Sequence, residues 1–348
     1  MNLYMQYEQL LSDKLWDRIL YNTPDFPMEK MFNEFSSSNF IAEYMFYKGY
    51  IKVLPWTAIN RDRKSFENKA QHTVSLFLLG LSTIRHMGIK IQNVPSYYED
   101  TDDNILYLWS IMCLYHDIGY FFENQKSAIT EKYPTVKEFI KYAQIKYNLL
   151  DVIDDSFLAE KYYTYILKKY HQVEHGITGG LLMYDRLMKD IHEHEELYGQ
   201  VNFYFGDKRR ISSSNKECAR IMSHSILRHN MWFANTDNYK EYEAAGLEKL
   251  ILNPEHNYKY RFNDNALLFL LCMLDTIEPV KKEKICTRYD VLKATDIVFD
   301  AEGKRLTISV TDGFEVDNYF NKIKDMEEWL DLLIDINKEK GIATIQIL

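Results

Sequence analysis

The sequence predicts a mainly α-helical fold, in which a bundle of helices is followed by a small C-terminal unit of strands and a helix. Between about residues 70 and 284, long segments with helical apolar patterns alternate with polar loops. After about Val291 the pattern changes to short alternating segments, which are typical of strands. We therefore expect an N-terminal helical segment over 1–69, a metal-binding helical domain over 70–290 and an α+β unit over 291–348.

The C-terminal unit is predicted to contain a β-hairpin, a helix and a final strand, in that order. Apolar residues alternate over 296–300 and 305–310 on both sides of a turn, so these segments are the expected strands of the hairpin. A helix is expected from Val316 to Lys340. The last strand is expected from Ile342 to Leu348.

The composition is that of an ordinary globular protein. The 348 residues are 46% hydrophobic and 27% charged, which excludes disordered and fibrous classes. A net charge of −9 disfavours a partner made of extended nucleic acid, but allows a local site for a small phosphorylated ligand. The four cysteines show no paired spacing, and neither a signal peptide nor a membrane span is apparent. We therefore expect a cytoplasmic protein without a membrane partner.

Histidines and aspartates recur at wide separations within this apolar helical sequence. The doublet His116-Asp117 ends an apolar run that begins at Ile105, and Asp275 ends a run that begins at Ala266. An ionised carboxylate without a partner is costly to bury, and a divalent cation shared with imidazoles removes much of that cost. The pattern therefore predicts a buried metal centre whose ligands come from several helices, unlike the short spacings of a zinc finger.

Taken in order, the candidate ligands follow the pattern H…HD…H…H…D. This set resembles the HD-domain superfamily of metal-dependent phosphohydrolases over roughly residues 70–284. The resemblance is carried by four segments together: His116-Asp117-Ile118-Gly119, His175-Gly176-Ile177-Thr178-Gly179-Gly180, Ser225-Ile226-Leu227-Arg228-His229-Asn230 and Leu274-Asp275-Thr276-Ile277-Glu278-Pro279.

The resemblance implies a helical domain that uses two divalent cations to activate water and hydrolyse a phosphate ester or anhydride. The expected substrate is a nucleotide or a cyclic or dinucleotide, and Mn, Fe, Co, Ni or Mg would suit the mixed imidazole and carboxylate ligands. By this resemblance Asp117, His175 and His229 are the catalytic residues. The implied ligands are His72, His116, Asp117 and Asp275 for the first cation, and Asp117, His175 and His229 for the second.

His224 is an alternative to His229 as a metal ligand. The two histidines are five residues apart, which turns an ideal helix by about 500°, so they point in different directions. The sequence His229-Asn230 favours His229. Glu278 is a further candidate, either as a ligand or as a residue just outside the ligands.

His171 and His175 are separated by one helical turn and are expected on one face of a helix. This arrangement places His171 at the rim of the same centre or makes it an alternative ligand. A zinc-protease helix is disfavoured, because the residue after the first histidine is Gln172 and not the glutamate that acts as general base.

The residues that contact the phosphate are less well defined by the sequence. Many members of the family carry a lysine after the glycine of the doublet segment, whereas this chain has Tyr120. The candidates for substrate contacts are Tyr120, Arg228, Lys281 and Lys282.

Two other functions fit the same ligands. One is a nuclease that acts on oligonucleotides. The other is a nucleotide-sensing or metal-sensing module with little turnover, which passes its state on through the C-terminal unit. A homodimer is expected if that unit contacts a second copy of the chain.

Overall fold

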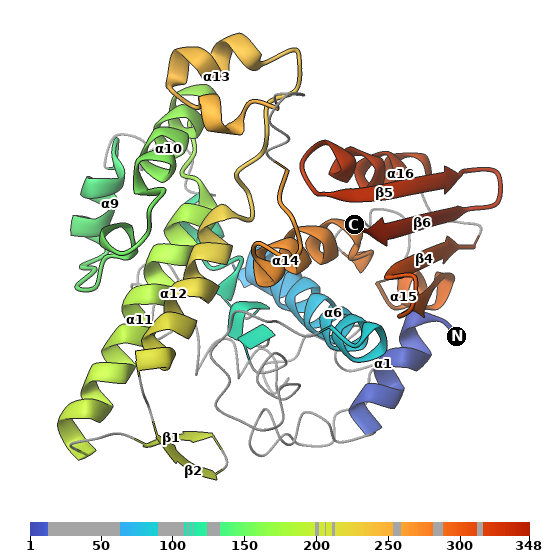
Figure 1. The fold of residues 1–348 in the computed structure, drawn as a ribbon, viewed down its shortest axis with the longest axis horizontal. Coiled ribbons are helices and arrows are strands. Elements are labelled where there is room, and N and C mark those ends of the chain that lie inside the picture. The colour runs from blue at the N-terminus through green and yellow to red at the C-terminus, as the bar shows by residue number, and fades with distance from the viewer. Residues whose placement is uncertain are drawn as a thin grey trace. The chain divides into compact units, whose positions relative to one another are not determined.

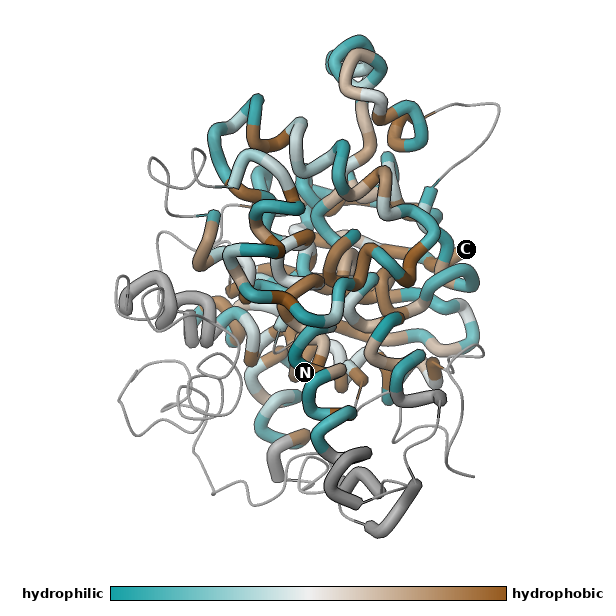
Figure 2. The backbone as a smooth tube through the Cα atoms, turned by 90° about the vertical axis from the view of Figure 1, so that its left-hand side faces the viewer, coloured by the Kyte–Doolittle hydropathy of each residue, from teal (hydrophilic) through white to brown (hydrophobic). Residues whose placement is uncertain are grey.

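A computed structural model describes the chain at residues 1–12, 63–89, 108–109, 111–113, 115–123, 133–198, 202–205, 207–210, 213–252, 259–280, 288–311 and 316–348. These residues are mostly helical and include a small antiparallel sheet of four strands near the C-terminus (Figure 1), which confirms the mainly α class. Brown and teal segments alternate along the helices in Figure 2, as expected of amphipathic helices that bury one face. Among the described helices, none is both long and apolar enough to cross a bilayer.

The chain forms two compact units. The first unit takes its described residues from 1–12, 64–113 and 259–348, and the second takes them from 115–252. The predicted boundary between residues 69 and 70 lies inside one continuous helix, α6 (Arg63–Met87). Most of the predicted N-terminal segment lies outside the described residues, so the division into three domains stays a prediction.

The second unit is built on two long helices, α11 (His175–Tyr198) and α12 (Ser213–Arg228), which run side by side (Figure 1). Small residues on α11 allow the close approach. A Cβ added at Gly180 would lie 2.6 Å from the backbone oxygen of Ser223, so only glycine fits there. The other elements of this unit are α8 (Tyr120–Glu123), α9 (Val136–Tyr142), η3 (Leu149–Asp151), α10 (Ser156–Tyr170), β1 (Asn202–Phe205), β2 (Asp207–Arg210), α13 (Tyr239–Ala245) and η4 (Glu248–Leu250).

The first unit packs helices together with the C-terminal sheet. Its core includes α14 (Ala266–Ile277), an almost wholly apolar helix that begins at the cap residue Asn265, whose side chain accepts from the Leu268 amide at 3.0 Å. The sheet has the order β3-β4-β6-β5 and is antiparallel throughout. The elements of the first unit are α1 (Leu3–Ser12), α6, α14, α15 (Arg288–Ala294), β3 (Thr295–Asp300), β4 (Arg305–Val310), α16 (Val316–Asp325), η6 (Met326–Glu328), β5 (Leu332–Asn337) and β6 (Ile342–Ile347).

The C-terminal unit contains one more strand than predicted. The hairpin of β3 and β4 and the final strand β6 are confirmed, but the expectation of a single helix over 316–340 is wrong. The helix α16 ends at Asp325, and β5 follows and pairs with β6. In β5 the buried Leu332 and Ile334 alternate with the exposed Leu333 and Asp335, and this period of two is that of a strand.

Two buried tyrosines join the ends of the first unit to its core helices. The Tyr7 hydroxyl on α1 donates to the Ser75 carbonyl of α6 at 3.1 Å, and the Tyr319 hydroxyl on α16 donates to the Ile277 carbonyl of α14 at 2.6 Å. Burial raises the pKa of both hydroxyls, and the charge of Glu278 raises each pKa further, so both stay neutral donors. The helices that they hold carry the candidate ligands His72 and Asp275.

Candidate metal centre

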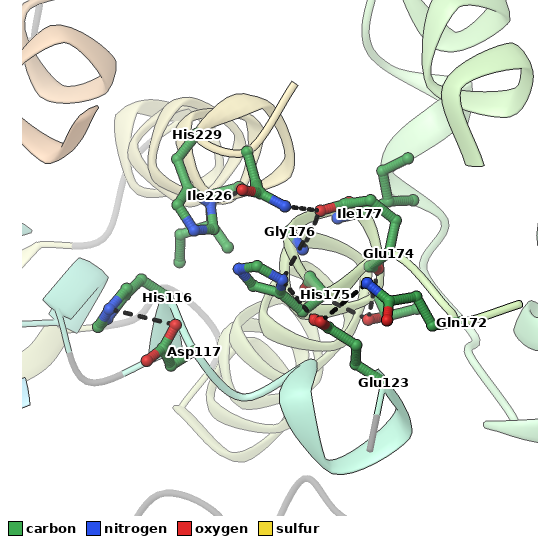
Figure 3. A network of polar contacts seen from close by, with 12 residues as sticks. His116, Asp117, Glu123, Gln172, Glu174, His175, Gly176, Ile177, Ile226 and His229 are labelled. Carbon is green, nitrogen blue, oxygen red and sulfur yellow. Dashed lines mark hydrogen bonds and ion pairs between the residues drawn. The ribbon is translucent and has the colours of Figure 1, made fainter. Parts of the chain in front are cut away.

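Three of the candidate ligands come together in the second unit. Asp117 lies in the turn before α8, His175 is the first residue of α11, and His229 directly follows the end of α12. Figure 3 shows how the three side chains lie. One ligand atom from each lies within 4.8 Å of the other two, and all three residues are buried. This is the complete set that the resemblance implies for the second cation.

Both histidines of this set are fixed by a hydrogen bond at Nδ1. His175 Nδ1 lies 2.7 Å from Glu123 Oε2, and His229 Nδ1 lies 2.6 Å from the Ile226 carbonyl oxygen. Because ionised carboxylate and carbonyl oxygens can only accept, Nδ1 carries the proton in each ring. Nε2 is therefore the ring atom that can bind a metal, and the carboxylate or carbonyl behind each histidine sets its orientation.

The turn that carries Asp117 fits closely against the start of α11. A Cβ added at Gly119 would lie only 2.0 Å from the His175 carbonyl oxygen, so the approach requires glycine. The Tyr120 ring stacks on the His175 ring with a centroid distance of 3.8 Å. His116 is fully buried, and its Nε2 lies 3.4 Å from Asp117 Oδ1. The glycine and the tyrosine thus keep the doublet and His175 together.

Glu174 links the ends of the two long helices at this site. Its buried carboxylate accepts from the amides of Gly176 at 3.0 Å and Ile177 at 2.6 Å, so it caps the start of α11. It also accepts from Asn230 Nδ2 at 2.8 Å, next to His229. Burial raises the pKa of Glu174, although the neighbouring His175 and these hydrogen bonds offset part of the effect. One side chain therefore fixes the residues that flank both ligand histidines.

In the first unit, His72 lies between two carboxylates. Its Nε2 is 2.9 Å from Asp275 Oδ1, and its Nδ1 is 2.7 Å from Glu278 Oε2. His72 and Glu278 are buried, and Glu278 also accepts from the Val280 amide at 2.8 Å. His72 thus repeats the arrangement of His175, with Nδ1 held by a glutamate. The set assigned to the first cation draws on both units, and as a set it stays a prediction.

His224 has a different partner from His229. Its Nε2 lies 2.8 Å from Asp155 Oδ1, and the guanidinium of Arg228 lies 2.8 Å from Asp155 Oδ2. Burial acts to raise the pKa of Asp155, but the hydrogen bond and charge of His224 and the charge of Arg228 outweigh it and hold the pKa below its usual range. The structure thus places His229 with Asp117 and His175, and it pairs Arg228 with an acid.

The expectation that His171 and His175 share one helical face is wrong. Helix α10 ends at Tyr170, and His171 adopts the left-handed conformation at φ 53° that terminates it. A new helix then begins at His175. His171 and His175 are therefore not one turn apart on a single helix. His171 is exposed, whereas His175 is buried, and the zinc-protease interpretation loses its structural premise.

Several residues of the site were not found from the sequence. Glu123 is far from His175 along the chain, and no spacing rule connects the two. Glu174 could have been recognised, because an acidic residue directly before a helix is a capping signal.

Of the predicted phosphate contacts, Lys281 and Lys282 lie outside the described residues.

The residues of the second unit could hold a metal ion. Two oriented imidazole nitrogens and one carboxylate are mixed donors, and three protein ligands leave positions for water or substrate. No family model, curated protein or solved structure matches this chain. The functional interpretation therefore depends on the geometry of the site and on the sequence pattern.

Replacing Glu123 with glutamine should weaken metal binding without removing a ligand. The neutral amide still fits, but it no longer fixes the His175 ring or increases its basicity. We expect a loss of affinity of about 10- to 100-fold for Mn²⁺ in isothermal titration. Asp155→Asn is the matched control, since Asp155 also holds a histidine, His224, that lies outside the set of Asp117, His175 and His229. Equal affinities in Glu123→Gln and wild type would contradict the role of Glu123.

Proposed function

We propose that the protein is a metal-dependent phosphohydrolase that binds two divalent cations and hydrolyses a phosphate ester or anhydride of a nucleotide. The observation that carries the proposal is the buried set of Asp117, His175 and His229, in which both imidazoles present Nε2. The resemblance of the ordered histidines and aspartates to the HD-domain superfamily supports it. In this proposal His72, His116 and Asp275 complete the ligands, and Asp117 is common to both cations.

Divalent cations at such a site lower the pKa of water towards 7 and offset the negative charge of the phosphoryl group. The residues of the chain supply a rigid frame for this chemistry. Glu123 and the Ile226 carbonyl hold the His175 and His229 rings, so neither ring has to reorient when substrate binds. A carboxylate has two oxygens and can serve two cations, which is the role that we assign to Asp117.

Burial of these ligands also matters for the proposed reaction. Asp117, His175 and His229 are shielded from bulk water, and charges interact more strongly where water is excluded. A buried carboxylate without a cation would carry a large desolvation cost, whereas a bound cation offsets it. Asp117 carries a negative charge and would repel a phosphate directly. The site is therefore better suited to a phosphorylated substrate that binds through metal ions.

Removal and return of the metal test the proposal. The full-length protein is stripped with a chelator, reloaded with Mn²⁺ and assayed with nucleoside phosphates, cyclic dinucleotides and bis(p-nitrophenyl) phosphate. We expect phosphate release only after reloading, because the stripped protein lacks the groups that activate water. Metal binding without turnover of any compound would favour the sensing module. A protein that binds no divalent metal at this site would contradict both the hydrolase and the metal-sensing module.

A further inference from the structure

The segment that follows His229 exposes one large aromatic ring. The neighbouring residues Met231 and Phe233 are buried, whereas Trp232 is 47% exposed. A tryptophan in water forgoes the stabilisation that burial of its large apolar surface would give. What distinguishes Trp232 from the other exposed apolar side chains is its place three residues after the candidate ligand His229.

The exposed indole is held in a fixed orientation. The Trp232 amide donates to the Tyr162 hydroxyl at 3.1 Å, and its carbonyl accepts from the Tyr242 hydroxyl at 2.9 Å. The indole Nε1 donates to Asn230 Oδ1 at 2.8 Å, which restricts rotation of the side chain. A ring that is already ordered loses little conformational entropy when a ligand stacks on it.

The same contacts connect Trp232 to the metal ligands. Asn230, which holds the indole, also donates to Glu174, and Glu174 caps the helix that begins with His175. Trp232 is three residues beyond His229, so their Cα atoms are at most about 11 Å apart. The backbone that carries Trp232 therefore lies near the candidate metal centre.

We propose that the indole of Trp232 is the stacking platform for the nucleobase of the substrate whose phosphate binds at the metal centre. This inference rests on the proposed function and assigns recognition of the nucleobase to one residue. Every nucleobase has a π-face, so stacking provides affinity for nucleotides without requiring one particular base. Simple phosphates and polyphosphates gain nothing from the ring.

Binding of matched ligands to full-length variants loaded with Mn²⁺ tests this inference. The ligands are AMP, ATP and inorganic tripolyphosphate, and the last of these keeps the phosphates of ATP but lacks the nucleoside. In Trp232→Ala we expect the Kd for AMP and ATP to rise by roughly 5- to 150-fold, with the Kd for tripolyphosphate unchanged. Trp232→Phe should recover most of the loss, since it retains a ring without the Nε1 donor.

Phe157→Ala is the matched control, because Phe157 on α10 is also aromatic and is 65% exposed. It should bind all three ligands like the wild type. Nucleotides should quench tryptophan fluorescence in the wild type and less so in Trp232→Phe. An equal loss for ATP and tripolyphosphate, no loss in Trp232→Ala, or no nucleotide binding by the wild type would overturn the inference.

Turnover assays of the same variants, set beside these binding data, separate this inference from the hydrolase proposal. Nucleotide binding that depends on Trp232, in a protein without phosphate release, would retain the stacking platform and reject the enzyme. Metal-dependent hydrolysis of ATP with the same KM in the wild type and in Trp232→Ala would retain the enzyme and reject the platform.

Discussion

Replacing Asp117 with alanine is expected to abolish phosphate release and to deplete the metal content of the protein. Asp117 belongs to both proposed ligand sets, so its loss weakens the binding of both cations. The cations contribute several kcal/mol of charge stabilisation to the reaction, and about 1.4 kcal/mol corresponds to a tenfold change in rate. We therefore expect a decrease in kcat of at least about 10³-fold, measured together with the metal content of the purified variant.

Two further variants separate this effect from a loss of folding. Asp117→Asn keeps the shape of the side chain and removes its charge, so it should fold while binding metal poorly. Asp185→Asn is the matched control, because the buried Asp185 accepts from the amides of Lys146 and Tyr147 and pairs with Lys189. It should lower the unfolding temperature yet leave the metal content intact. Normal activity in Asp117→Asn would refute the proposed role.

The variants His229→Ala and His224→Ala should lose different properties: the first should lose metal binding, and the second should lose folding stability. His229→Ala removes a ligand, so the protein should lose metal from the set of Asp117 and His175, and turnover should fall by at least about 10²-fold. His224→Ala removes a partner of Asp155 and should cost about 1–3 kcal/mol of folding free energy. Its metal content should stay that of the wild type.

Metal analysis and urea unfolding of the two variants measure these effects side by side. The pair is well matched, since both histidines lie near the C-terminal end of α12 and differ in what they contact. If His224→Ala lost the metal and His229→Ala kept it, the ligand assignment would be reversed and the geometry of the site misinterpreted.

The sequence was most informative where a local pattern determines the structure. Alternation of apolar residues predicted the hairpin of β3 and β4, whose pairing is local along the chain. The strand β5 was missed because its sequence, Leu332 to Asn337, follows a helical segment without a glycine or proline to separate them. Its pairing with β6 decides its conformation, and this tertiary contact overrides local preference.

In the candidate site, too, some features were predicted from the sequence and others depend on tertiary contacts. The resemblance to the HD-domain superfamily implied that Asp117, His175 and His229 lie together, and the structure places them together. The residues that orient the ligands were not predicted. Glu123 reaches His175 only because the fold brings them together, and no sequence spacing connects the two. His171 was misplaced because its spacing from His175 assumes a continuous helix, whereas the chain leaves the helix at His171 and Glu174 caps a new one.

An anomalous diffraction experiment on crystals grown with Mn²⁺ tests the central claim most directly. We expect two anomalous peaks about 3.5–4 Å apart with Asp117 bound to both. One ion should be bound by Nε2 of His175 and His229, and the other by His72, His116 and Asp275. Anomalous peaks only at other residues, or a site at which Asp117 binds no metal, would contradict the account.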